Sequence, residues 1–325
     1  MNLALETPAA GRMCPADYLY SPSVFDRAPE LETDTLYVVG GLYGNLAALE
    51  AVERLAAAEP TPPAIVFNGD FHWFDAEPEW FAAIERAVAR HPALRGNVET
   101  EIAREGDIGA GCGCAYPPSV DENVVRRSNM ILRELRAICP QAARSRLAAL
   151  PMHLVAQVGP LRVGVVHGDA GSLAGWRFAH DALDDPKSHA WRDQVRQSST
   201  VDVFASTHTC LAALRDFALR DFALRDLPLS AGRLTVINNG AAGMPNFSAS
   251  TFGVISRIAT SRSPHRTLYG LLRDDVRIDA IAVHYDRRAF LDRFLARWPQ
   301  GSSAHQSYFS RIAGGPDYPM TCAVA

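Results

Sequence analysis

The sequence predicts a mixed α/β fold, at the boundary of α/β and α+β, in which two β-sheets pack face to face with helices outside. In the first half, short apolar runs that end at glycine, at 36–41 and 64–70, alternate with helical patterns, as expected for parallel strands buried on both faces. After about residue 152, strand patterns with tight turns dominate. With 325 residues, of which 48% are hydrophobic, the chain is long enough to bury such a core.

The two helices predicted in the first half follow from the spacing of their apolar residues. Segments 45–58 and 77–91 each place apolar side chains on one broad face. These side chains are Leu46, Leu49, Val52 and Leu55 in the first segment and Trp80, Phe81, Ile84 and Val88 in the second. The order strand, helix, strand, helix predicts a right-handed parallel unit whose strand ends share one edge, where open α/β sheets bind ligands.

The strands of the second half are bounded by turn residues. Residues 153–168 predict a hairpin that turns at Gly159 and Pro160. Further strands are predicted at 233–240, 251–259, 267–275 and 276–286, and a closing helix at 287–298. Strands that are segregated after an α/β half indicate two sheets packed face to face.

Three segments are predicted along the chain. Residues 1–33, rich in proline, alanine and acidic residues, form an N-terminal extension; residues 34–298 form one domain; and residues 299–325 form a C-terminal tail. A five-residue unit repeats within 214–226, and this period matches neither a helix nor a strand. It is interpreted as a tandem expansion that lengthens a surface hairpin, or alternatively as a flap over the site.

Composition argues against several classes of partner. A formal net charge of -4 and the lack of a basic run argue against nucleic acid and favour a small molecule. No apolar stretch has the length that a signal peptide or a membrane span needs, so no membrane association is expected. Six scattered cysteines predict reduced thiols and a cytoplasmic location. The oligomeric state is left open.

Residues of metal-ligand type follow several predicted strand ends. The series is VVGGLYGNLAAL (38–49), VFNGD (66–70), LRGNVE (94–99), VVHGD (165–169), VFASTHTC (203–210) and VINNGAAGMP (236–245). It resembles the calcineurin-like metallophosphoesterases, in which Asp-x-His-Gly-Asn, Gly-Asp, Gly-Asn-His-Glu, His-Gly and Gly-His-x-His motifs surround two metal ions. The resemblance covers roughly residues 36–286 and implies a four-layer α/β/β/α sandwich.

Asp70, Asn97 and His167 are the residues expected to serve in both metal binding and catalysis. Each lies at a predicted strand end beside a glycine, which leaves room around the side chain. A metal centre that hydrolyses phosphoesters needs a carboxylate together with neutral imidazole and amide ligands, which these residue types provide. For each residue alone, a helix cap, a turn or a structural histidine is the alternative interpretation.

His208 is the fourth expected metal ligand. It aligns with the second histidine of the last family motif if residues 205–208 are read against Gly-His-x-His. A shift by one residue would put Thr207 and Thr209 at the histidine positions instead.

Four positions depart from the family motifs. Gly41 and Tyr43 stand where the first motif has its aspartate and histidine, Val98 where the third has its histidine, and Ser206 where the last has its first histidine. Val98 replaces the residue that assists the leaving group in the family, which predicts poor cleavage of alkyl esters.

The surviving ligands divide unequally between the two implied metal sites. The first site would retain Asp70 and His208, and the second would retain Asp70, Asn97 and His167, with Ser206 in place of a histidine. The second site is therefore the more credible. We expect about one weakly held divalent ion per chain, with manganese, iron, zinc and nickel left open.

Four further residues are possible replacement ligands by position or type: His72, Glu99, Cys112 and Cys114. His72 alternatively packs in an aromatic cluster, and a Cys-x-Cys without a second pair has low specificity as a zinc site. Tyr43 is expected to fill the volume of a missing metal.

The predicted function is hydrolysis of a small phosphomonoester or phosphodiester by a metal-activated water. A non-catalytic binding scaffold with the same fold is the alternative. An α/β protein of unrelated chemistry would be favoured if the strand-end residues did not converge. Asp70, Asn97, His167 and His208 are therefore expected to meet in one crevice.

Overall fold

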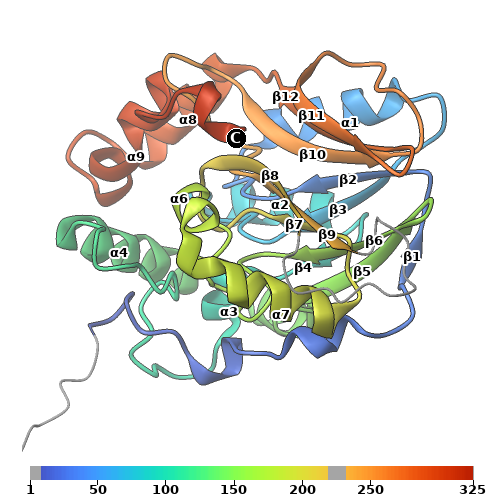
Figure 1. The fold of residues 1–325 in the computed structure, drawn as a ribbon. Helices are drawn as coiled ribbons and strands as arrows, with labels where there is room; N and C mark the ends of the chain where they lie inside the picture. Colours follow the sequence, from blue (N-terminus) through green and yellow to red (C-terminus); the bar gives the residue numbers. More distant parts are fainter. Residues whose placement is uncertain (1–8, 219–231, 325) are drawn as a thin grey trace, which may run out of the picture.

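The computed structural model describes residues 9–218 and 232–324 and contains two six-stranded sheets packed face to face between outer helices (Figure 1). One sheet has the spatial order β11 (Thr267–Arg273), β12 (Val276–Val283), β10 (Gly253–Ala259), β2 (Thr35–Val39), β3 (Ala64–Asn68) and β4 (Ala93–Leu94). The other has the order β1 (Leu31–Glu32), β5 (His153–Val158), β6 (Leu161–Val166), β7 (Val203–Ser206), β9 (Arg233–Asn239) and β8 (Ala212–Ala218). The predicted α/β sandwich is confirmed.

Helices lie on the outside of both sheets. The α-helices are α1 (Leu46–Ala57), α2 (Pro78–Val88), α3 (Asn97–Ala103), α4 (Glu122–Ile138), α5 (Gln141–Ala149), α6 (His180–Asp184), α7 (His189–Ser199), α8 (Arg287–Arg297) and α9 (Ser303–Gly314). Short 3-10 helices occur at Ala16–Tyr18, Pro22–Phe25, Pro186–Ser188 and Met320–Ala323. Helix α1 contacts β12 of one sheet, and α7 contacts β9 of the other. Among residues 9–218 and 232–324, no helix combines the length and the hydropathy that crossing a membrane requires.

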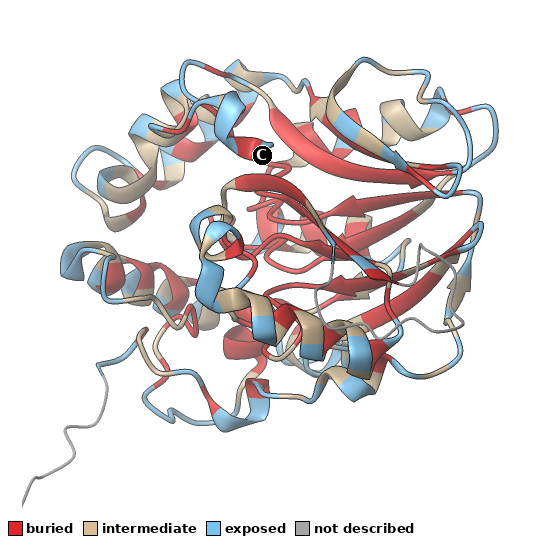
Figure 2. Ribbon diagram, viewed as in Figure 1, coloured by how far each residue is buried: buried red, intermediate tan, exposed pale blue. Residues whose placement is uncertain are grey.

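Both faces of the central strands are buried, which explains their continuous apolar runs. In β2, Leu36 and Val38 belong to the core between the sheets, whereas Tyr37 and Val39 belong to the core beneath the helices. Successive side chains of a strand point to opposite faces, so β2 contributes to both layers. Figure 2 shows these strands as buried, red ribbons through the centre of the molecule.

The two sheets do not correspond to the two halves of the sequence. Strands β2, β3 and β4 pair in parallel, and β10 returns to pair antiparallel with β2, with Ser256 opposite Val38 and Arg257 opposite Tyr37. All five residues of β2 are buried. An unpaired edge there would leave buried N–H and C=O groups without partners, and β10 supplies those partners.

The predicted hairpin is confirmed. Strands β5 and β6 pair antiparallel, with Val158 opposite Leu161 across the turn at Gly159 and Pro160. Gly159 has a φ of 53°, a left-handed conformation that favours glycine. The helices predicted over 45–58, 77–91 and 287–298 correspond to α1, α2 and α8.

Both terminal segments contact the sandwich. Tyr18 is buried and donates a 2.8 Å hydrogen bond to Glu101 Oε1. At the other end of the chain, Ala304 and Ile312 of α9 are buried, and α9 contacts α4. The domain boundaries at residues 34 and 298 stay predictions.

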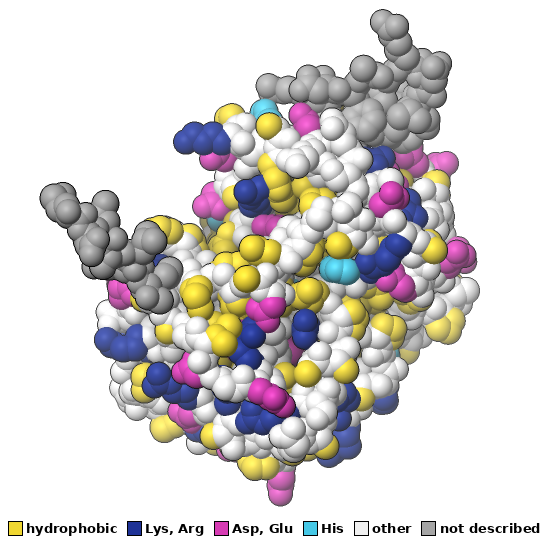
Figure 3. Space-filling model, turned by 90° about the horizontal axis from the view of Figure 1, so that it is seen from below, with side chains coloured by type: hydrophobic (Ala, Val, Ile, Leu, Met, Phe, Trp, Pro, Cys, Tyr) yellow, Lys and Arg dark blue, Asp and Glu magenta, His cyan; other side chains and the backbone are white. Residues whose placement is uncertain are grey.

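Most of the repeat within 214–226 falls in residues 219–231, which lie outside the described residues. Both interpretations of the repeat therefore stay predictions. On the face drawn in Figure 3, basic side chains in dark blue and acidic side chains in magenta are interspersed. The mixed signs on this face agree with the small net charge of the chain.

Candidate metal centre

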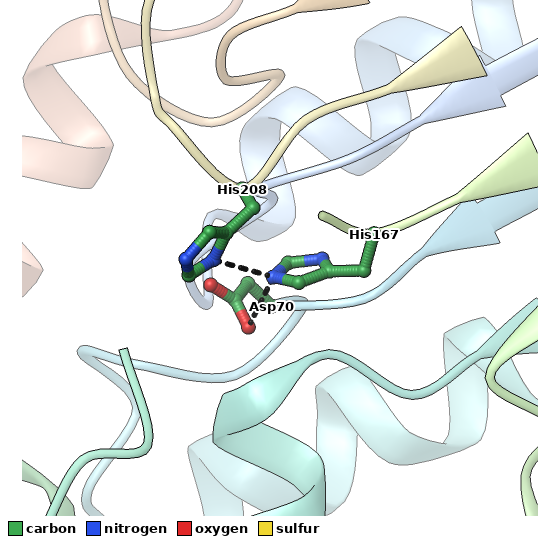
Figure 4. Close-up of side chains that lie close together, drawn as sticks. All are labelled: Asp70, His167 and His208. Atoms are coloured by element: carbon green, nitrogen blue, oxygen red, sulfur yellow. Dashed lines mark hydrogen bonds and ion pairs between the residues drawn. The ribbon is translucent and has the colours of Figure 1, made fainter. Parts of the chain in front are cut away.

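Four polar side chains converge where the ends of the two sheets meet. Asp70 follows β3, Asn97 begins α3 after β4, His167 follows β6 and His208 follows β7. The candidate ligand atoms of Asp70, His167 and His208 lie within 4.8 Å of one another (Figure 4). His167 Nε2 lies 3.2 Å from His208 Nδ1 and 3.4 Å from Asp70 Oδ1. The same nitrogen lies 3.1 Å from Asn97 Oδ1.

Two glycines allow these strand ends to approach each other. Gly69 has a φ of 73°, and a Cβ there would lie 2.5 Å from the backbone nitrogen of Gly96. A Cβ at Gly96 would lie 2.4 Å from Asp70 Oδ1 and 2.8 Å from His167 Cε1. Since real Cβ atoms do not approach other atoms this closely, the Gly-Asp and Gly-Asn pairs are what bring the carboxylate and the amide beside His167.

Gly96→Ala is expected to weaken metal binding without unfolding the chain. Gly96 has a φ of -93°, which alanine adopts readily, so the effect comes from a Cβ that displaces the Asp70 carboxylate. We expect metal affinity to fall by about 10-fold to 100-fold, as for other disturbances of ligand orientation. Gly314→Ala is the control, because its Cβ position has no atom within 4 Å. Equal affinities of the two variants, measured by competition with a chelator, would contradict the geometry.

Hydrogen bonds outside the centre determine which atoms face it. His167 Nδ1 lies 2.9 Å from the carbonyl oxygen of Asn68, and His208 Nε2 lies 3.1 Å from the carbonyl oxygen of Cys114. A carbonyl only accepts, so both nitrogens donate. His208 Nδ1 therefore turns its lone pair inward, and His167 Nε2 does the same whenever the His167 ring is neutral. Asn97 Nδ2 donates to the carbonyl oxygen of Cys112 at 2.9 Å, which turns Asn97 Oδ1 inward as well.

Electrostatics within the cluster favour a neutral His208. Burial lowers the pKa of His208, and the neighbouring His167 lowers it further, to about 3. Burial would also lower the pKa of His167, but the Asp70 carboxylate outweighs burial and raises it. Burial would raise the pKa of Asp70, but His167 and His208 outweigh burial and lower it. The centre therefore combines an ionised carboxylate with an imidazole that is ready to bind a cation at neutral pH.

His72 is held by carboxylates on both sides of its ring. Its Nδ1 lies 2.6 Å from Asp75 Oδ2, and its Nε2 lies 3.0 Å from Glu85 Oε1. The ring stacks on Phe81 with 3.8 Å between centroids. With both nitrogens engaged, His72 contributes no ligand to the cluster in this structure, and the aromatic packing considered from the sequence is observed.

Glu99 braces the backbone of the site. Its carboxylate accepts hydrogen bonds from the backbone nitrogens of Asp70, Phe71, His72 and Gly96, at 2.8 to 3.2 Å. These four bonds join the loop after β3 to the start of α3. Since its oxygens are engaged in this way, Glu99 holds the loop that carries Asp70 and does not act as a replacement ligand in this structure.

The Cys-x-Cys pair contributes backbone atoms to the surroundings of the centre. The carbonyl oxygens of Cys112 and Cys114 accept hydrogen bonds from Asn97 and His208, as described above. Cys114 Sγ lies 3.4 Å from Asn97 Nδ2, and the thiols of both residues are buried and free. Their sulfur atoms do not join the cluster of candidate ligand atoms found in the described part of the chain.

The structure places the four expected ligands in one cluster. The candidate ligand atoms of His208 lie beside those of Asp70 and His167, and Asn97 Oδ1 lies beside His167 Nε2. Ser206 Oγ donates to the carbonyl oxygen of Gly168 at 2.6 Å. The division of these residues between two metal sites stays a prediction.

The alternative register is not supported. Thr207 Oγ1 donates to the carbonyl oxygen of Gly240 at 2.8 Å, and Thr209 Oγ1 accepts from Asn238 Nδ2 at 2.9 Å. Both hydroxyls therefore bond away from the cluster. The sequence left this choice open because Thr-His-Thr offers a polar side chain in either register.

Tyr43 and Cys210 contact each other beside the cluster. Tyr43 Oη lies 2.8 Å from Cys210 Sγ, and burial raises the pKa of both groups. The ring of Tyr43 also occupies the space beside Gly41, where a Cβ would lie 2.8 Å from a ring carbon. The expectation that Tyr43 takes the volume of a missing metal stays a prediction.

Arg311 is a charged neighbour that the sequence did not single out. It reaches from α9 and donates from Nη2 to the carbonyl oxygen of Cys210. Its Nε is buried without a hydrogen-bond partner, and no carboxylate of the described residues forms an ion pair with it. Arg311 lies beyond the range of the motifs, and an arginine in an amphipathic helix has no sequence signal that points to a site.

The centre is enclosed. Asp70 and His208 are 5% exposed, Asn97 is 1% exposed and His167 is fully buried. Trp176 covers one side: its ring centroid lies 5.3 Å from that of His208, and its Nε1 donates to the carbonyl oxygen of Cys114 at 3.0 Å. The carbonyl oxygen of Cys114 therefore holds both His208 and the Trp176 ring that lies against it.

Comparisons with known proteins identify the fold. No family model and no curated protein matches the sequence. A hypothetical protein of Pyrococcus horikoshii OT3 has a similar structure, with a TM-score of 0.56 at 17% identity over 87% of this chain and 99% of the other. A metallophosphoesterase of Sphaerobacter thermophilus has a TM-score of 0.53 at 18% identity with the same coverage. At these identities the likeness concerns the fold, and the chain has the fold of the calcineurin-like metallophosphoesterases.

Proposed function

We propose that this protein is a metal-dependent phosphoesterase that holds one divalent ion between Asp70, Asn97, His167 and His208. The observation that carries the proposal is the convergence of four electron-pair donors, three of which have their N–H groups engaged outside the centre. When His167 is neutral, these acceptors face one another in a buried site without a donor between them, which is unfavourable. A divalent cation would relieve this arrangement, and the fold supports the same conclusion.

The donor set suits a transition metal. Two imidazole nitrogens and two oxygens are compatible with manganese, iron, zinc or nickel. When bound, the ion supplies Lewis acidity that activates water and offsets the charge on a phosphoryl group. Asp70 contributes the one negative charge of the set, and the other three ligands bind as neutral groups. The loaded centre would therefore keep a net positive charge, which favours an anionic phosphoester of small size as substrate.

Arg311 supplies a second positive charge beside this centre. It lies against Cys210, two residues after His208, on the side where Tyr43 replaces a family ligand. A guanidinium binds phosphoryl oxygens through paired N–H groups, so Arg311 is proposed to hold the phosphoryl group in place of the missing metal. Arg311→Gln is expected to keep the metal but to lower kcat/KM by about 10²-fold to 10³-fold, as for the loss of one transition-state donor.

Substrate access requires a movement of the covering segment. Residues 112–116 close the centre, and Gly109, Gly111 and Gly113 in and before this segment all have positive φ. Glycine lets the backbone leave such a conformation at low cost. Since the hydrogen bonds to the carbonyl oxygens of Cys112 and Cys114 orient two ligands, opening of the segment is proposed to loosen the centre and closure to complete it.

Hydrolysis of an aryl phosphoester by the manganese-supplemented protein tests the proposal. His167→Ala removes the donor that contacts the other three ligands, so both metal and activity should be lost. Ser206→Ala is the control, because its hydroxyl bonds only to the backbone carbonyl oxygens of Gly168 and His167 and to none of the candidate ligand atoms, and it should retain both. Unchanged activity in His167→Ala would refute the proposed site. Metal binding without hydrolysis under any metal would instead support a non-catalytic scaffold.

A further inference from the structure

A second candidate binding site lies apart from the metal centre. A cavity of about 750 Å³ is lined by residues of α3, α4, α5 and the N-terminal segment. Its lining includes Arg95, Arg104, Arg136 and Arg144, and none of the four candidate metal ligands. Sites for small molecules commonly measure about 300–1,000 Å³, so the cavity has the size of a ligand site.

Carboxylates neutralise only one of these arginines. Arg104 forms ion pairs with Asp17 and Glu101. The other three donate to backbone carbonyl oxygens: Arg95 to Ala148, Arg136 to Arg104 and Gly106, and Arg144 to Ile102 and Arg136. Within residues 9–218 and 232–324, no carboxylate forms an ion pair with any of these three. A carbonyl carries only a partial negative charge, so these three formal positive charges have no ion-pair partner, although the carboxylate of Glu105 also lines the cavity.

Arg95 is the least satisfied member of the group. Its Nε is buried and has no hydrogen-bond partner, and burial lowers the pKa of its guanidinium. An unpaired donor on a partly buried charge is costly. An anion in the cavity would supply both the acceptor and the counter-charge. The lining carries four arginines against two carboxylates, those of Asp17 and Glu105.

We propose that this cavity binds a phosphate-bearing small molecule, with Arg95, Arg136 and Arg144 holding the phosphate oxygens. Arginine is suited to this role because its planar guanidinium offers paired N–H donors that match phosphate. Donors are available to bind phosphate oxygens. The hydrogen bonds described above do not use Nε and Nη2 of Arg95 or Nε and Nη1 of Arg136. The cavity is larger than one phosphate group, which favours a phosphorylated molecule or a pyrophosphate over free phosphate.

Calorimetric titration of the full-length protein with inorganic pyrophosphate tests this site. A chelator is present throughout, so that the probe cannot bind through a metal ion. Arg95→Gln and Arg144→Gln are each expected to weaken binding by about 10-fold to 100-fold, the effect of losing a hydrogen bond to a charged group. Arg133→Gln is the matched control, because Arg133 is an exposed residue of the same α4 that carries Arg136 and its loss changes the net charge equally.

Each result decides for or against the site. The cavity site is supported if Arg95→Gln and Arg144→Gln lose pyrophosphate binding while Arg133→Gln retains it. Retained binding in Asp70→Asn shows that the cavity site is separate from the metal centre. Tighter binding of pyrophosphate than of inorganic phosphate favours the larger ligand. Equal weakening in Arg133→Gln, loss in Asp70→Asn or the absence of binding would overturn the proposal. Arg95→Lys keeps the charge but not the paired donors, so its affinity for pyrophosphate should lie between those of Arg95→Gln and the parent protein. This variant also serves as the test if a glutamine variant fails to fold.

Discussion

Asp70→Asn is expected to abolish metal binding and, with it, phosphoester hydrolysis. Asp70 is the only carboxylate among the four candidate ligands, and its Oδ1 lies 3.4 Å from His167 Nε2. An amide of the same shape keeps the volume and an acceptor oxygen for the backbone N–H of Val98 but removes the charge that balances the cation. Loss of an outer hydrogen-bond partner costs about 10-fold to 100-fold in metal affinity, so loss of a charged ligand should cost more than that.

The measurements for Asp70→Asn are its metal content after dialysis and kcat/KM with an aryl phosphoester. Asp292→Asn is the matched control, because Asp292 is a largely exposed aspartate whose nearest cation, Arg288, is exposed as well. The control should behave like the parent. If Asp70→Asn retained a tightly held ion and full activity, the metal centre would have to lie elsewhere.

Esters with good leaving groups are expected to be cleaved far faster than alkyl esters. Val98 stands where the family has a histidine, and its buried side chain offers no proton to a departing alkoxide. Nearby, burial raises the pKa of Tyr43 and of Cys210, so both are weak acids at neutral pH. A general acid contributes about 10²-fold to 10⁴-fold, and we expect kcat/KM for an aryl phosphoester to exceed that for an alkyl one by this order.

The variant Val98→His tests whether a missing general acid at position 98 limits the cleavage of alkyl esters. It restores an imidazole at the family position and should raise the rate for the alkyl ester while changing the aryl rate little, because an aryl oxide leaves without protonation. Equal rates for aryl and alkyl esters in the parent protein would show that another group acts as the acid. Tyr43→Phe would then identify whether the Tyr43 hydroxyl is that group.

The positions of the site residues were predictable because they depend on strand ends. Asp70 and His167 each terminate an apolar run, and strand ends that line one edge of a sandwich must meet. The glycines beside Asp70 and Asn97 gave a further signal, since each leaves space that a Cβ would fill. Pattern and local chemistry were therefore sufficient for the fold and for predicting which side chains converge, whereas their role as metal ligands stays a prediction.

The contacts among those side chains were not predictable, because they depend on three-dimensional packing. The distance between His208 and His167 depends on the path of the chain after β7, and Thr207 and Thr209 left two alignments of the last motif open. The orientation of the histidine rings depends on backbone carbonyl oxygens, including that of Cys114. Since every residue has a carbonyl group, the sequence does not show which of them accepts a hydrogen bond. The pairing of β10 with β2 joins residues more than two hundred positions apart in the sequence and has no local pattern.

The contribution of Arg311 was hidden for a related reason. Its guanidinium reaches the site from a C-terminal helix outside the motif series. The spacing of apolar and polar residues in that helix does not distinguish Arg311 from an arginine on the surface. For Glu99, the position in the third motif predicted a possible ligand, and the sequence did not predict that four backbone N–H groups engage its carboxylate. Residue type and position in the sequence do not distinguish a side chain that binds a metal ion from one that holds the backbone through hydrogen bonds.

The metal content of the full-length protein, purified without chelator and measured by elemental analysis, tests the central claim most directly. The proposed set of four ligands, with Tyr43 and Cys210 packed against each other beside it, predicts about one divalent ion per chain, lost in Asp70→Asn and retained in Asp292→Asn. Two tightly held ions per chain would contradict the account, because they would require ligands beyond the proposed set. No bound ion after supplementation with manganese, iron, zinc or nickel would contradict it as well.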